Sequence, residues 1–219
     1  MDFSVNILAL GIPFSVALLL ASLGEMFNQR AGVFNLGCEG IMAMGAFLGM
    51  LVPYCVGHGG PVPETFNVLG LLLAMAVGAL LGILFGLVVV SFRAPQGIAG
   101  IGLQMFGVGT AGTLFRHFVG GTQSVPGIDR LPIPVLSEIP FLGPVLFSHN
   151  PLVYLTFLLV PAAWYILFRT PWGLRVRASG ANPRAADSVG IRVNLVRFQA
   201  LAVGGALAGL AGAYLSLCQ

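Results

Sequence analysis

The chain has 219 residues, of which 57% are hydrophobic and only 8% are charged, whereas about a quarter of the residues of an average soluble domain are charged. This composition excludes a water-soluble globular domain and indicates several helices that cross a hydrocarbon layer about 30 Å thick. The net charge of +3 does not predict a nucleic-acid partner, because in so apolar a chain the positive residues report membrane topology instead.

Six apolar segments are long enough to span a membrane, so we predict an all-α, polytopic transmembrane helical bundle that forms a single domain over residues 1–219. The segments are 5–23, 36–56, 68–92, 97–118, 151–168 and 197–217. If the arginine-rich stretch after the fifth segment is cytoplasmic, eight of the ten arginines lie on the cytoplasmic side, as the positive-inside rule requires. We therefore predict an external N-terminus and a multi-pass membrane protein that is surrounded by lipid.

The start of the second segment carries a carboxylate among apolar residues. Glu39 lies four residues into the apolar run, and a charged group there must face a partner or water. Two interpretations remain open: Glu39 contacts a substrate, or it is a structural acceptor near the cytoplasmic interface. We expect Arg30 to be its ion partner, and Asn35, one helical turn earlier, is a second polar candidate.

Small residues recur at every fourth position of the third segment, from Gly70 through Gly78 to Gly86. The sixth segment repeats this pattern with Gly205 and Gly209. Such spacing lets the backbones of two membrane helices approach closely. We interpret both stretches as packing faces rather than as ligand sites.

The fourth segment contains six glycines between residues 97 and 112, together with the amides of Gln96 and Gln104. This composition predicts either a broken helix that lines a pathway or a tightly packed interior helix. Amides both donate and accept hydrogen bonds, which suits hydroxyl-rich ligands, and Phe106 could stack on a base or a sugar face. The alternative for the amides is hydrogen bonding between packed helices.

The external side of the predicted bundle offers no candidate chemistry. Five prolines between residues 120 and 150 exclude a long helix, so we expect an ordered external loop over 120–150. His58, His117 and His149 are isolated from one another near the external ends of segments, and no metal site is predicted.

The loop between the fifth and sixth segments, residues 169–197, is predicted to be cytoplasmic and to contain a short capped helix. Asn182 is a favourable N-cap, Pro183 suits the first helical position, and Gly190 suits the position after the end. A helix of about two turns is unstable alone in water, so we expect it to dock on a partner with an acidic groove. Contact with anionic lipid headgroups is the alternative. The residues assigned to docking are Arg175, Arg177, Asn182, Pro183, Arg184, Ala185, Ala186, Asp187 and Gly190.

Several stretches of the sequence resemble one transporter family. They are the loop TPWGLRVRASGANPRAADSVGIRVNLVR at 170–197, the NLGCEG core at 35–40, the stretch APQGIAGIGLQMF at 94–106 and the ending GGALAGLAGAYLSL. They resemble the bacterial permeases of ATP-binding-cassette (ABC) importers for nucleosides and simple sugars, which are related to branched-chain amino-acid and ribose permeases. Ala181 departs from the pattern, because relatives often have Glu at this position.

The resemblance implies a type II importer-like permease whose cytoplasmic loop couples it to a separate ATPase subunit. The implied partners are ABC ATPase subunits, a second permease subunit in a homo- or heterodimer, and an extracytoplasmic substrate-binding lipoprotein. The chain is then not an enzyme: it has no catalytic residues and binds no cofactor, and the partner subunit hydrolyses ATP. The candidate substrate-pathway residues are Asn35, Glu39, Gln96, Gln104 and Phe106.

A self-sufficient, ion-coupled secondary transporter or channel for a small polar solute is the alternative function. In that case Glu39 and the fourth segment would form the ion-coupled site. Members of the family usually continue through further helices after the sixth segment, so we also expect the chain to be a truncated piece of a longer permease.

Overall fold

The computed structural model describes residues 3–57, 63–120 and 149–218, and these residues are predominantly helical. The elements are α1 Phe3–Arg30, α2 Cys38–Gly57, α3 Glu64–Gly86 with the π-helix η1 Leu87–Ser91, α4 Gln96–Phe118, α6 Pro151–Arg169, α7 Pro171–Ala181, α8 Pro183–Ser188 and α9 Val193–Leu217. In the described part of the chain, six helices are long and apolar enough to cross a membrane. The predicted all-α, six-span architecture is confirmed, whereas the predicted external loop at 120–150 lies almost wholly outside the described residues.

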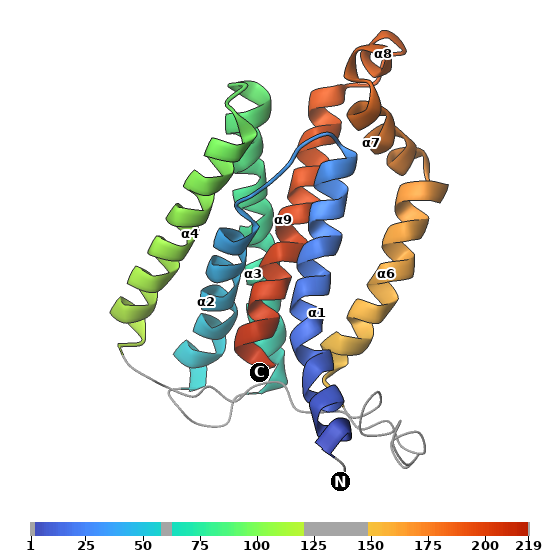
Figure 1. Ribbon diagram of the computed structural model, residues 1–219. Helices are drawn as coiled ribbons and strands as arrows, with labels where there is room; N and C mark the ends of the chain where they lie inside the picture. Colours follow the sequence, from blue (N-terminus) through green and yellow to red (C-terminus); the bar gives the residue numbers. More distant parts are fainter. Residues whose placement is uncertain (1–2, 58–62, 121–148, 219) are drawn as a thin grey trace.

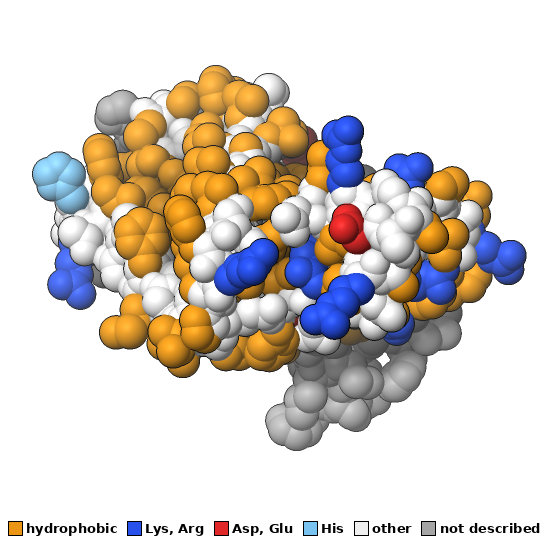
Figure 2. Space-filling view, turned by 90° about the horizontal axis from the view of Figure 1, so that it is seen from above, with side chains coloured by type: hydrophobic (Ala, Val, Ile, Leu, Met, Phe, Trp, Pro, Cys, Tyr) orange, Lys and Arg blue, Asp and Glu red, His pale blue; other side chains and the backbone are white. Residues whose placement is uncertain are grey.

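The spanning helices run side by side, with α7 and α8 at one end of the bundle and both chain termini at the other (Figure 1). Figure 2 looks onto the α7–α8 end and shows arginine side chains gathered around it. The positive-inside rule therefore places this end in the cytoplasm.

α9 is the central helix and packs against α1, α2 and α3. Small residues make this possible: a Cβ atom added to Gly205 or Gly209 would collide with the backbone of α3, at Gly78 and Ala74 respectively. On the α2 side, a Cβ atom on Gly45 would collide with Gly209 in the same way. The small-residue stretches are packing faces, as predicted.

α4 lies at the edge of the bundle and is one continuous helix of 23 residues (Figure 1). Its buried residues are Gly100, Gly107 and Ala111, so the prediction of a broken or an interior helix is wrong for this chain. Each glycine costs a helix about 1 kcal/mol relative to alanine. Two of them recover part of that cost, because Gly100 and Gly107 let the chain from Leu36 to Gly40 pack directly on the backbone of α4.

Two helical stretches near the cytoplasmic end were not predicted from the sequence. α1 continues to Arg30, well beyond the end of its apolar run, and α7 forms an additional helix of 11 residues before α8. The Thr170 side chain caps α7 by accepting from the Gly173 amide over 3.1 Å, and Pro171 occupies its first position. These are the same signals that identified α8.

Candidate functional site

The chain between α1 and α2 turns back into the bundle. Gly32, just after the end of α1, has a φ of +80°. The backbone amide of Asn35 donates a hydrogen bond to the Glu25 carboxylate over 3.0 Å. Glu25 lies five residues before the end of α1, which corresponds to about 7 Å of helix. α2 therefore begins partway down the bundle, as Figure 1 shows. We call residues Ala31–Gly37 the re-entrant segment.

Side chains from three helices bind the backbone of the re-entrant segment. Arg197 of α9 donates from Nε to the Ala31 carbonyl over 3.2 Å. Gln96 of α4 accepts from the Phe34 amide over 2.9 Å, and the Glu25 bond described above comes from α1. Irregular backbone at membrane depth is stable only where such partners replace the missing helical hydrogen bonds. The three side chains therefore fix the path of the segment.

Glu25 is a residue to which sequence reasoning gave no role in the site. Its carboxylate also accepts from Asn28 over 2.9 Å and from Gln29 over 3.4 Å, so one acceptor serves three donors. The sequence contained a signal, a carboxylate followed by two amides within about one helical turn. The hydropathy pattern did not reveal this signal, because the apolar run ends before Glu25, whereas helix α1 continues to Arg30.

Glu39 lies deeper in the bundle than the cytoplasmic interface where we expected it. It accepts a hydrogen bond from the Gln104 side chain, which is eight residues into α4 and so about 12 Å from the start of that helix. The neighbouring Gly40 packs on the same stretch, since a Cβ atom added to it would lie 2.6 Å from the Leu103 carbonyl. The expected ion pair with Arg30 is wrong: the guanidinium of Arg30 lies 5.6 Å from the centroid of the Phe168 ring.

The five predicted pathway residues divide into three groups in the structure. Glu39 and Gln104 bind each other between α2 and α4. Gln96 holds the re-entrant segment, and Asn35 is only 5% exposed and accepts from the backbone two residues ahead, so these two amides shape the backbone. Phe106 lines a separate apolar pocket of about 320 Å³ between α3 and α4.

The Glu39 carboxylate identifies a surface that cannot face hydrocarbon. Glu39 is exposed on the single chain, Gln104 is half-buried, and the neighbouring Met105 is 72% exposed. A charged side chain near the middle of a bilayer costs about 3 kcal/mol or more. Water or further protein must therefore cover this surface, which we call the α2–α4 face and define by Glu39, Gln104 and Met105.

The predicted cytoplasmic helix is present as α8. The Asn182 side chain accepts from the Ala185 amide over 3.1 Å, Pro183 is the first helical residue, and Gly190 has the left-handed φ of +84° that ends the turn. Ala186 is buried, whereas Val189 is 75% exposed. α8 thus rests on the bundle through one small side chain and leaves most of its surface free.

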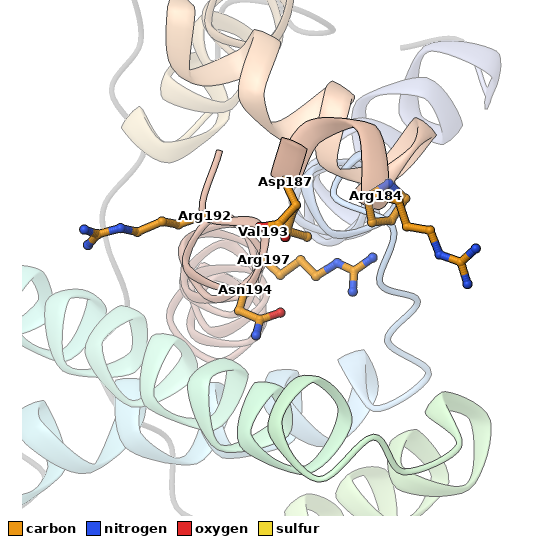
Figure 3. A pocket seen from close by; sticks show the side chains of 7 residues that line it. Arg184, Asp187, Arg192, Val193, Asn194 and Arg197 are labelled. Atoms are coloured by element: carbon orange, nitrogen blue, oxygen red, sulfur yellow. The ribbon is translucent and has the colours of Figure 1, made fainter. Parts of the chain in front are cut away.

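Basic side chains dominate a pocket beside α8. The pocket has a volume of about 460 Å³ and is lined by Pro183, Arg184, Asp187, Arg192, Val193, Asn194 and Arg197. Figure 3 shows Arg192 extending to one side of the pocket and Arg184 and Arg197 to the other. The lining of the pocket thus contains three guanidinium groups and a single carboxylate, that of Asp187, and the pocket suits an anionic group.

Contacts along α7 tie α8 to the ends of the spanning helices. The backbone of Gly180 packs on that of Arg30, and the Trp172 side chain donates to Gln199 over 2.9 Å. Arg177 is half-buried, and its guanidinium lies 5.0 Å from the centroid of the Phe168 ring. Arg175 is exposed. A force on α7 or α8 would thus reach α1 and α9 directly.

Comparisons with known proteins place these features in a family. A family model described as the permease component of the branched-chain amino acid transport system matches residues 7–219. The guanosine ABC transporter permease protein NupQ of Bacillus subtilis is 36% identical, over 95% of this chain and 67% of that protein. The putative glucose ABC transporter permease protein TsgC13 of Haloferax volcanii is 34% identical, over 99% of this chain and 64% of that protein.

A third relative gives a similar result. The nucleoside ABC transporter permease protein NupC of Lactococcus lactis is 32% identical, over 91% of this chain and 63% of that protein. The chain thus spans about two thirds of the length of these relatives. No solved structure shows a significant match.

Proposed function

Because the chain belongs to the family of permease components of the branched-chain amino acid transport system, we propose that it is the membrane-spanning subunit of an ABC importer for nucleosides or simple sugars. It is a multi-pass protein of the inner membrane, with six spans in the described residues. The relatives named for guanosine, nucleosides and glucose support this substrate class.

The observation that carries the proposal is the Glu39–Gln104 pair, exposed at membrane depth on the α2–α4 face. A carboxylate accepts hydrogen bonds from hydroxyl groups, and an amide both donates and accepts them. A sugar or a ribose offers both kinds of group. We assign this pair to substrate contact, Asn35 and Gln96 to the backbone that positions it, and Phe106 to stacking from the separate apolar pocket between α3 and α4.

A second permease subunit, identical or related, covers the α2–α4 face in this proposal. The substrate path then runs between the two subunits, where water satisfies Glu39 and lipid is excluded. An extracytoplasmic substrate-binding lipoprotein delivers the solute to the end of the bundle that carries the chain termini. That end lies opposite α7 and α8 (Figure 1).

Docking of a separate ABC ATPase is assigned to α7 and α8. Ala186 seats α8 on the bundle, while Arg184, Asp187 and Val189 remain exposed for the partner. ATP is hydrolysed by that partner, and this chain binds no cofactor. Closure of the ATPase pair would push α8 and, through α7, tilt α1 and α9 from an outward-open to an inward-open arrangement.

Uptake by the assembled transporter tests the proposal. The permease, its ATPase and its binding protein are reconstituted in vesicles, and uptake of labelled guanosine and glucose is measured with and without ATP. We expect ATP-dependent uptake that falls at least tenfold for Glu39→Gln, because a hydrogen bond to a charged group is worth about 1.5 to 3 kcal/mol. Glu64→Gln is the matched control, since Glu64 is exposed at the start of α3.

An ion-coupled secondary transporter is the competing function, because an exposed carboxylate at membrane depth also suits proton or sodium coupling. Uptake that persists without ATP but stops when the proton or sodium gradient collapses would establish this alternative. It would contradict the importer.

A further inference from the structure

Arg197 is the residue at which the cytoplasmic pocket and the re-entrant segment meet. It lies in the first turns of α9 and lines the pocket beside α8. Its Nε also donates to the Ala31 carbonyl over 3.2 Å. Among the described residues that line this pocket, Arg197 alone makes a hydrogen bond to the re-entrant segment.

The packing around this bond leaves little room for independent movement. A Cβ atom placed on Gly32 would lie 3.4 Å from an Nη atom of Arg197 and 3.0 Å from the Cα atom of Gly180. The turn after α1 therefore packs against both the end of α7 and the Arg197 guanidinium. Close-packed groups of this kind transmit a displacement rather than absorb it.

The re-entrant segment leads from Ala31 directly to the site on the α2–α4 face. It has no regular structure between α1 and α2. Its other side-chain partners, Gln96 and Glu25, accept from two of its backbone amides, and backbone carbonyl groups of α1 accept from its first three amides, those of residues 31–33. α2 begins with Cys38 and Glu39 immediately after it. A shift of the Ala31 carbonyl would thus change the angle at which Glu39 is presented to Gln104.

We propose that Arg197 is a positioning residue that couples occupation of the cytoplasmic pocket to the placement of the re-entrant segment and of Glu39. The occupant of the pocket is an acidic side chain of the docked ATPase. This inference rests on the proposed function, and it assigns to one side chain the step between docking and the substrate site.

The chemistry of the pocket supports an acidic occupant. The guanidinium groups of Arg184, Arg192 and Arg197 outnumber the carboxylate of Asp187. An arginine presents five N–H donors in a rigid planar fork, so its Nε cannot move independently of its Nη atoms. A carboxylate that binds the Nη atoms would reorient the whole group and with it the bond to Ala31.

The native Cys38 provides a reporter for the test, because it is a partly exposed thiol between the re-entrant segment and Glu39. Cys55 and Cys218 are replaced by serine in the full permease–ATPase complex. The rate at which a water-soluble maleimide modifies Cys38 is measured with and without a non-hydrolysable ATP analogue. Arg197→Ala and Arg197→Lys are compared with Arg192→Ala, which removes the same charge from the same pocket but no bond to the re-entrant segment.

We expect nucleotide to change the labelling rate in the unmodified complex and in Arg192→Ala, and this response to be lost in Arg197→Ala. Substrate transported per ATP hydrolysed should fall about tenfold in Arg197→Ala, because one charge-assisted hydrogen bond is lost. Co-purification of the ATPase should weaken no more than in Arg192→Ala, which removes one guanidinium group from the same pocket. Arg197→Lys, which keeps the charge and a hydrogen-bond donor group but not the planar fork, should recover part of both signals.

Three results would overturn the inference. If Arg197→Ala retains the nucleotide response, Arg197 is only a docking residue and the importer assignment stands. If Cys38 labelling responds to the anionic lipid content of the vesicles without any ATPase, the occupant is a lipid headgroup. If the unmodified complex shows no ATP-dependent uptake, the proposed function and the inference fail together.

Discussion

Every glycine of α3 packs against a neighbouring element, whereas the glycines of α4 divide between packed and open positions. In the α3–α9 interface, Gly78 and Gly205 each lie so close to the opposing backbone that a Cβ atom would collide with it. In α4, a Cβ atom on Gly102, Gly109 or Gly112 would have no neighbour within 4 Å among the described residues. The bundle thus has one sealed side, built on close helix contacts, and one open side.

The open side carries the polar residues that a lipid-facing surface cannot hold. Glu39 and Gln104 lie on it, whereas the sealed side buries mainly small and aliphatic side chains. Glycine content alone therefore does not distinguish a packing face from a functional surface. The functional surface is marked by a polar side chain beside the glycines.

We expect the largest effect on stability from a substitution that disrupts the close helix packing of the sealed side. Gly209→Val would drive a side chain into the carbonyl of Ala74 and should destabilise the permease by about 3 kcal/mol, since overpacked cores cannot relax freely. Gly109→Val is the matched control in open space. Thermal unfolding in detergent, followed by size-exclusion chromatography, measures both, and equal melting temperatures would contradict the contrast between the two sides.

Removing the acceptor that anchors the re-entrant segment should have the next largest effect. Glu25→Gln replaces the carboxylate shared by Asn28, Gln29 and the Asn35 amide. It should cost about 2 kcal/mol of stability, because two buried donors, on Asn28 and Asn35, lose a charged partner. Glu64→Gln serves as the control at an exposed position. An unchanged melting temperature for Glu25→Gln would mean that water replaces the carboxylate.

A smaller effect is expected at α8. Asn182→Ala removes the cap on the Ala185 amide, which costs a helix about 1 kcal/mol. The affinity of the permease for its ATPase should fall roughly fivefold if α8 docks in its folded form. Asn182→Asp keeps a capping oxygen and should bind like the parent chain. Equal loss in both variants would point to a direct contact of the amide instead.

Local signals in the sequence were sufficient where the structure is itself local. Asn182, Pro183 and Gly190 define α8 because capping depends on residues within one or two turns. The small-residue spacing of the third and sixth segments predicted their packing for the same reason. α7 carries an equivalent signal at Thr170 and Pro171, so this helix was also predictable from the sequence.

The candidate site depends on the path of the chain, which local signals do not report. Gln104 binds Glu39 across 65 residues of sequence, and this pairing requires the re-entrant segment to carry α2 down into the bundle. The expectation that Arg30 pairs with Glu39 assumed that α2 begins at the cytoplasmic end. The sequence likewise did not predict that α4 lies on the open side of the bundle, because its glycine composition fits an exposed helix and an interior helix equally.

Accessibility of the α2–α4 face in the assembled transporter tests the central claim most directly. Single cysteines are placed at Met105, beside Gln104, and at Leu158 of α6, which is 66% exposed on the single chain. The three native cysteines are replaced by serine. Both variants are treated with a charged, water-soluble thiol reagent, with and without substrate.

The account predicts that the reagent modifies the cysteine at position 105, that substrate slows this reaction, and that the cysteine at position 158 resists it. A cysteine at position 105 that reacts only with a lipid-soluble reagent, as expected for position 158, would show that the α2–α4 face meets lipid. That result would contradict its role as the substrate path.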